Sequence, residues 1–67
     1  YDEAIAEYQK AIEIDSNMSI AYYNLGVTYQ HKGMIDKSVE QYRKILEIEP
    51  ENTMAQEALK QLKRGAP

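Results

Sequence analysis

The sequence predicts an all-α fold in which short helices form antiparallel hairpins. Three observations support this prediction: apolar residues recur at helical spacing along most of the chain, glycine and proline are rare, and one stretch repeats another at a fixed distance. Of the 67 residues, 3 are glycine, 2 are proline and none is cysteine. Because no disulfide can stabilise so small a chain, its stability must come from helix packing.

Four stretches show the helical pattern, and turn-forming residues separate them. They cover residues 1–14, 19–32, 35–48 and 53–63. Asp15-Ser16-Asn17 ends the first stretch, Gly33 the second and Pro50 the third, because these residues favour turns or cannot continue a helix. Thr53 followed by Gln56 predicts a capping box at the start of the fourth stretch. The short connections place neighbouring helices antiparallel.

The first and third stretches are copies of one another. Residues 2–15 align without a gap with residues 36–49, so the offset is 34 residues. The second and fourth stretches share this offset, as Leu25 and Leu59 show. A period of this length made of two helices predicts a repeat protein, in which each unit buries its apolar faces against its neighbours.

Residues 19–52 carry a specific set of side chains at fixed spacing. The set is an aromatic, Leu-Gly and a second aromatic, then a small residue, an aromatic and a proline: Tyr22, Leu25, Gly26, Tyr29, Ser38, Tyr42 and Pro50. This pattern resembles the tetratricopeptide-repeat family. Two positions depart mildly from it, since Tyr22 stands where the family usually has tryptophan and Ser38 where it has alanine.

The resemblance implies a right-handed solenoid of four helices, about one and a half repeats with a capping helix. Residues 1–18 would be the second helix of a preceding repeat, residues 19–52 one complete repeat, and residues 53–67 a C-terminal capping helix and tail. Because the chain begins at Tyr1 without a methionine, we expect it to be a piece of a longer array, with its parent protein and upstream repeats undetermined.

The fourth stretch has the pattern of a terminal helix. The second stretch carries Tyr22, Gly26 and Tyr29 on one face, and the same face of the fourth, shifted by 34, carries polar residues: Gln56, Lys60 and Lys63. Its other face keeps four apolar residues to dock on the preceding helices: Ala55, Ala58, Leu59 and Leu62. An apolar inner face with a polar outer face is what a capping helix needs.

A second apolar stripe on the second stretch, formed by Ile20, Tyr23 and Val27, lies nearly opposite its packing face. In tetratricopeptide proteins the first helix of each repeat lines a concave groove that receives a peptide or helix of a partner protein. The resemblance therefore implies nine partner-binding residues: Ile20, Tyr23, Asn24, Val27, Gln30, His31, Met54, Glu57 and Gln61. It suggests a protein-interaction module within a scaffold or co-chaperone-like protein.

Two of these residues have alternative interpretations. Many family members use an asparagine at the position of Asn24 to bond the ligand's backbone, but Asn24 could equally be a solvated helix residue. Tyr23 could anchor a partner or pack within the chain. Some family members grip a terminal carboxylate with basic and polar side chains. Val27 and His31 stand at such positions here, which argues against that mode of binding.

The first stretch predicts a competing function. Its apolar residues Ile5, Tyr8 and Ile12 lack the partner helix of their own repeat. Either upstream repeats cover this flank or another copy of the chain does, with exchange of helices as one route. The alternative function is therefore a structural element that forms homo-oligomers.

Other function classes find little support in the sequence. The formal charge of −3 argues against general nucleic-acid binding, and no apolar run is long enough to span a membrane. No cofactor site, no multi-histidine metal site and no catalytic constellation accompanies the paired acidic residues, which suit solvated helix faces, so we expect no enzyme activity. The absence of cysteine is compatible with a reducing compartment such as the cytoplasm but does not determine it.

Overall fold

The computed structural model describes the backbone of residues 1–65 and the side chains of residues 1–63. Within that part the chain forms four helices, α1 (Asp2–Ile14), α2 (Ser19–His31), α3 (Ile35–Ile48) and α4 (Thr53–Gly65), and no strands. The all-α prediction is confirmed, and each end of the predicted helices lies within two residues of the observed one. The last two residues of the predicted tail lie outside the described residues.

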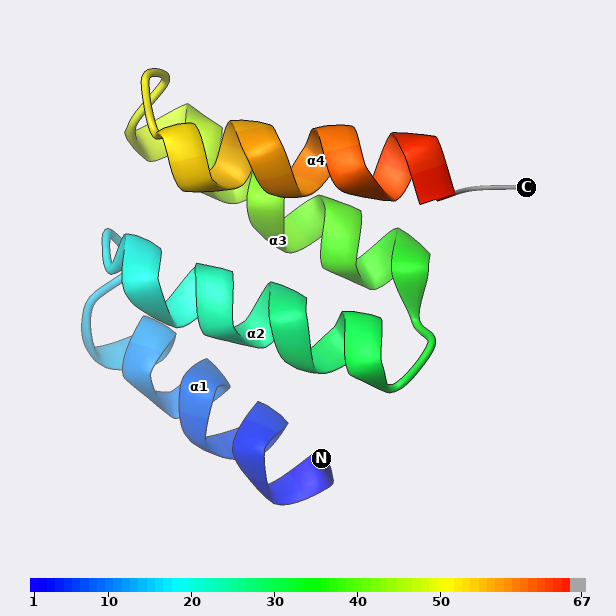
Figure 1. The fold of residues 1–67 in the computed structure, drawn as a ribbon. Helices are drawn as coiled ribbons and strands as arrows, with labels where there is room; N and C mark the ends of the chain where they lie inside the picture. Colours follow the sequence, from blue (N-terminus) through cyan, green and yellow to red (C-terminus); the bar gives the residue numbers. More distant parts are fainter. Residues whose placement is uncertain (66–67) are drawn as a thin grey trace.

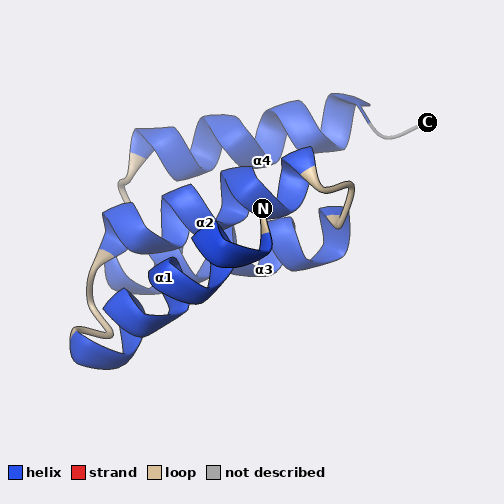
Figure 2. Cartoon of the chain, turned by 90° about the horizontal axis from the view of Figure 1, so that it is seen from below, coloured by secondary structure: helices blue, strands red, loops and turns tan. Residues whose placement is uncertain are grey.

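The helices follow one another side by side, and each runs antiparallel to the one before it (Figure 1). Extensive contacts join α1 to α2, α2 to α3 and α3 to α4. Figure 2 shows the same order from below, with α1 nearest the viewer and α4 farthest away. The principal extents of 35, 28 and 13 Å describe a slab rather than a sphere. A sequential stack of this kind is the geometry of a helical repeat protein.

The core lies among α2, α3 and α4. Its buried apolar side chains are Ala21, Tyr22, Leu25, Tyr29, Tyr42, Ile45, Ala55 and Leu62. No residue of α1 is fully buried. The face of α4 predicted to dock is buried or half-buried, whereas Gln56, Lys60 and Lys63 are exposed. The amphipathic character predicted for α4 is therefore present in the structure.

The α2 and α3 helices approach each other closely at Gly26 on α2. A Cβ atom at this position would lie 2.6 Å from Cε1 and 2.9 Å from Cζ of Tyr42 on α3. The hydroxyl of the fully buried Ser38 donates a 2.7 Å hydrogen bond to the carbonyl oxygen of Gly26. A glycine inside a helix costs stability, and here its missing side chain provides the space for the Tyr42 ring.

Specific turn hydrogen bonds follow the ends of α1 and α2. Asp15 accepts a 3.0 Å hydrogen bond from the backbone N–H of Asn17, which forms an Asx turn after α1. After α2, Gly33 has a φ of 85°. Its N–H donates to Gln30 and the next N–H, of Met34, donates to Tyr29, which is the Schellman pattern.

The predicted capping box at Thr53 is wrong. Asn52 caps α4 instead, because its Oδ1 accepts a 2.9 Å hydrogen bond from the backbone N–H of Ala55. The Gln56 side chain donates to the carbonyl oxygen of Pro50 at 3.0 Å rather than to Thr53. Asn52 is the stronger capping residue of the two candidates, so the helix begins one residue after it.

Candidate functional site

A hollow of about 300 Å³ lies between α2 and α4. Six of the nine residues predicted to bind a partner line it: Tyr23, Val27, Gln30, Met54, Glu57 and Gln61. Thr53 and Ala58 of α4 and Tyr42 of α3 complete the lining. The structure thus brings the predicted faces of the first helices of two consecutive units to the same hollow.

A second hollow of about 200 Å³ adjoins the first at the N-terminal end of α2. Ser19, Ile20 and Asn52 line it, together with Tyr23 and Met54, which also line the first hollow. Ile20 and Met54 are exposed over 58% and 50% of their surface, respectively, so both apolar side chains are available to a ligand. The two hollows share the side chains of Tyr23 and Met54, and together with the third hollow described next they are here called the trough.

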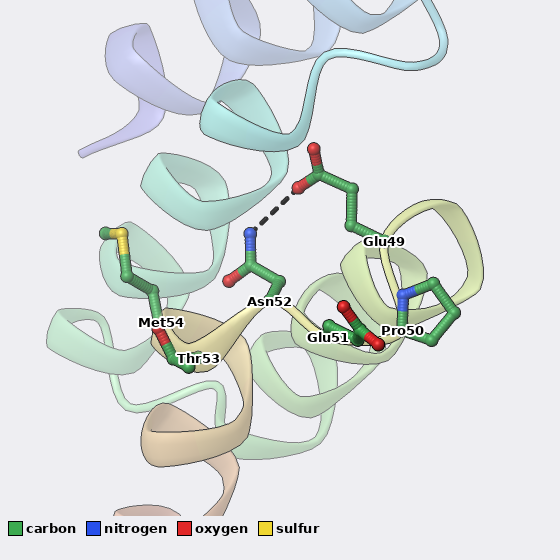
Figure 3. A pocket seen from close by; sticks show the side chains of 6 residues that line it. All are labelled: Glu49, Pro50, Glu51, Asn52, Thr53 and Met54. Carbon is green, nitrogen blue, oxygen red and sulfur yellow. Dashed lines mark hydrogen bonds between the residues drawn. The ribbon is translucent and has the colours of Figure 1, made fainter.

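A third hollow, of about 580 Å³, is formed by residues 49–54 at the α3–α4 turn and shares Met54 with the other two (Figure 3). Figure 3 shows the Asn52 amide pointing at the Glu49 carboxylate, with Met54 on the far side of Asn52. Asn52 Nδ2 donates to Glu49 Oε1 at 2.9 Å. This hydrogen bond lowers the pKa of Glu49, because it stabilises the ionised carboxylate.

Aromatic packing supports the floor of the trough. The rings of Tyr23 and Tyr42 lie 5.7 Å apart between centroids and are tilted by 48°, within the range of favourable aromatic pairs. The Tyr42 hydroxyl donates to Gln30 Oε1 at 3.2 Å. Burial raises the pKa of Tyr42, because the ionised phenolate is poorly solvated there. Tyr23 therefore packs within the chain and also presents part of its half-buried surface to the trough.

Asn24 and His31 are not among the residues that line these hollows. Asn24 is half-buried, and its backbone oxygen accepts a 2.8 Å bond from the Thr28 hydroxyl. The exposed His31 ring stacks against Tyr1 at a centroid distance of 6.3 Å, toward α1 rather than α4. Their assignment as partner-binding residues remains a prediction.

The predicted self-association residues, Ile5, Tyr8 and Ile12, are all half-buried on α1. Tyr8 is the equivalent of Tyr42 one repeat earlier, and Tyr42 is only 1% exposed. The difference arises because α3 lies between α2 and α4, whereas α1 packs chiefly against α2. One flank of α1 thus keeps apolar surface that its counterpart in the next repeat buries.

Sequence reasoning did not assign Glu49, Asn52, Thr53 or Tyr42 to the site. Tyr42 belongs to the repeat motif, and in the structure it is buried and also lines the trough. Asn52 differs from its equivalent one repeat earlier, Met18, and that substitution immediately before a helix was the available signal. Among the described residues no group of three or more potential ligands is placed to hold a metal ion. No described helix is long and apolar enough to cross a membrane.

Comparisons with known proteins agree with this architecture. A family model described as "TPR repeat" matches residues 1–33, and one described as "Tetratricopeptide repeat" matches residues 19–52. The chain is 30% identical over 64 residues to "Sperm-associated antigen 1" of Mus musculus, which covers 96% of this chain and 7% of that protein. It is 37% identical over 60 residues to "Small glutamine-rich tetratricopeptide repeat-containing protein 2" of Saccharomyces cerevisiae, covering 90% of this chain and 17% of that protein.

A third relative has an enzyme name. The chain is 43% identical over 43 residues to "Probable UDP-N-acetylglucosamine--peptide N-acetylglucosaminyltransferase SPINDLY" of Oryza sativa subsp. japonica, covering 64% of this chain but 5% of that protein. The chain thus spans only a small part of the length of each of these relatives. The family model that matches residues 19–52 covers one whole repeat, and the observed helix stack has the same period. The chain therefore belongs to the tetratricopeptide-repeat family.

Proposed function

We propose that this chain is a non-enzymatic binding module that holds a peptide or helix of a partner protein in the trough between α2 and α4. Tetratricopeptide repeats generally mediate protein–protein interaction. The observation that supports this particular site is the convergence of six predicted side chains from two helices on one hollow. None of the residues that line the three hollows carries a positive charge, which favours a protein over a nucleic acid as the partner.

The surface of the trough has the mixture that peptide recognition needs. Val27, Met54 and Ile20 offer apolar surface, and Gln30 and Gln61 offer amides that can both donate and accept hydrogen bonds. Tyrosine and methionine beside such amides suit a surface that binds a segment by several side chains at once. A scaffold or co-chaperone-like parent protein would use this segment as one part of a longer array.

The test uses a random peptide library displayed on phage and selected against the chain. The best selected peptide is then titrated into the ¹⁵N-labelled protein. We expect chemical-shift changes centred on Tyr23, Val27 and Met54. Val27→Glu should abolish these shift changes, because it places a charge on the apolar surface of the trough. Glu7→Gln, at an exposed position of α1, should leave them unchanged. Shift changes confined to other helices would contradict the proposal.

Self-association is the second candidate function, supported by the apolar flank of α1. A second copy could cover Ile5, Tyr8 and Ile12, either by docking or by exchange of helices. Light scattering after size exclusion, over a range of concentrations, separates the two functions. A mass that rises with concentration supports homo-oligomers, and a constant monomer mass contradicts them.

A further inference from the structure

The trough carries charge of only one sign. Glu57 lines its α2–α4 part, and Glu49 and Glu51 line the part beside the α3–α4 turn. These three side chains, here called the acidic rim, are all exposed. No lysine, arginine or histidine lines any of the three hollows. A ligand in the trough therefore meets negative charge in two of its three hollows, and no lining cation offsets it.

Cations line a different hollow, of about 420 Å³, between α3 and α4. Arg43 and Lys63 line it together with apolar residues of the same two helices: Ile35, Val39, Leu59 and Leu62. None of these residues lines the trough. The formal net charge of the whole chain is only −3, yet the trough is lined by acidic residues and this hollow by basic ones. The sign of the trough is a property of this surface and does not follow from the net charge.

The acidic rim is partly preorganised. Asn52 accepts a hydrogen bond from Ala55 through Oδ1 and donates one to Glu49 through Nδ2. The same side chain therefore caps α4 and holds the Glu49 carboxylate at the mouth of the trough. Because this carboxylate is held in place before a ligand arrives, an incoming cation loses less free energy to the ordering of side chains.

We propose that the trough selects segments in which lysine or arginine alternates with apolar side chains. This inference rests on the proposed peptide-binding function and names the class of its ligand. Apolar side chains would cover Ile20, Val27 and Met54, and basic ones would meet the acidic rim. An acidic segment, or one that enters by its terminal carboxylate, is repelled by the acidic rim without a compensating cation.

The first experiment compares three synthetic peptides with the same apolar residues, separated by lysine, glutamine or glutamate. Both ends of each peptide are blocked so that terminal charges do not contribute. Affinity is measured by fluorescence anisotropy, and the binding site is mapped by ¹⁵N chemical shifts. We expect the lysine peptide to bind in the trough at least tenfold more tightly than the glutamine peptide and the glutamate peptide to bind more weakly still. The preference should shrink as salt is added, because exposed charges are screened.

The second experiment tests where the selectivity originates. One variant replaces the three glutamates of the acidic rim by glutamine. A matched control makes the same change at three exposed glutamates outside the trough: Glu7, Glu13 and Glu40. The two variants have the same net charge, and circular dichroism checks that both remain helical. The rim variant should bind the lysine peptide roughly tenfold more weakly, as expected for the loss of three exposed charge pairs. The control variant should lose less than about threefold in affinity.

The outcomes separate this inference from the proposed function. If all three peptides shift trough resonances with equal affinity, or if the rim and control variants lose affinity equally, the charge selectivity is refuted while peptide binding stands. If the glutamate peptide binds best, the selectivity is likewise refuted. If neither these peptides nor the library-selected peptide shifts Tyr23, Val27 and Met54, the trough is not a peptide site and both proposals fail.

Discussion

The Tyr42 ring lies so close to Gly26 that its Cε1 atom is 2.6 Å from the place where a Cβ atom on that glycine would stand. Tyr42 is 1% exposed and lies between Tyr23 and Gly26. This contact fixes the distance between α2 and α3, and it also positions the aromatic floor of the trough. The packing of the repeat and the shape of the binding surface therefore depend on the same ring.

Gly26→Ala should destabilise the fold despite the higher helix propensity of alanine. Overpacking costs roughly 1–3 kcal/mol, and the propensity gain returns about 1 kcal/mol, so we expect a net loss of up to about 2 kcal/mol in urea denaturation. The penalty should largely vanish in a Tyr42→Leu background, because the obstructing ring is then absent. An equal effect of Gly26→Ala on stability in the parent chain and in the Tyr42→Leu background would contradict the packing argument.

Gly33→Ala tests a different property of glycine. No atom lies within 4 Å of a Cβ built at this position, but its φ of 85° is unfavourable for a residue with a side chain. We expect a loss of about 1–2 kcal/mol, measured by urea denaturation. Gly33→Asn should lose less, because asparagine tolerates the left-handed region better. An alanine variant as stable as the parent would show that the α2–α3 turn can relax.

Asn52→Ala should affect stability and titration together. Loss of the cap costs about 0.5–2 kcal/mol of stability at neutral pH. The pKa of Glu49, lowered in the parent below the ordinary value of 4.5, should rise toward it in the variant, because the donor to its carboxylate is gone. Carboxyl NMR titration measures this shift.

The sign of the pH dependence follows from the lowered pKa. The ionised Glu49 stabilises the fold above the unfolded pKa, and that contribution disappears as pH falls through the folded pKa. Chemical denaturation between neutral pH and pH values below the folded pKa should show the corresponding loss in the parent and a smaller loss in Asn52→Ala. Thr53→Ala is the control, and a rise of the Glu49 pKa in that variant would contradict the assignment of Asn52 as the donor to the Glu49 carboxylate.

Tyr8→Glu tests whether α1 mediates assembly. If a second copy covers the half-buried Tyr8, a buried carboxylate without a partner would strongly oppose that contact. We expect the concentration-dependent mass measured by light scattering to fall to that of a monomer, whereas Glu7→Gln should assemble like the parent. Unchanged assembly in Tyr8→Glu would remove α1 from the interface.

Much of the fold could be predicted because its signals are local and regular. Helical spacing of apolar residues placed the four helices, and the repeat identified which residues form the core, such as Tyr42 and Leu25. The start of α4 was harder to predict, since Thr53 and Asn52 are both good caps by residue type. Their difference depends on which backbone donor each side chain reaches, and that depends on how the turn after Pro50 folds.

The sequence by itself determined the helix order, the repeat and most of the surface that faces the trough, because these follow from a fixed period and from which helix face must be apolar. Only the tertiary structure decided that residues 49–54 add a hollow to this surface, that Asn52 holds Glu49 there, and that Arg43 and Lys63 line a different hollow. It also showed that His31 lies toward Tyr1. These are distances between side chains on separate elements, and they depend on how helices cross and how turns close, which a one-dimensional pattern does not encode.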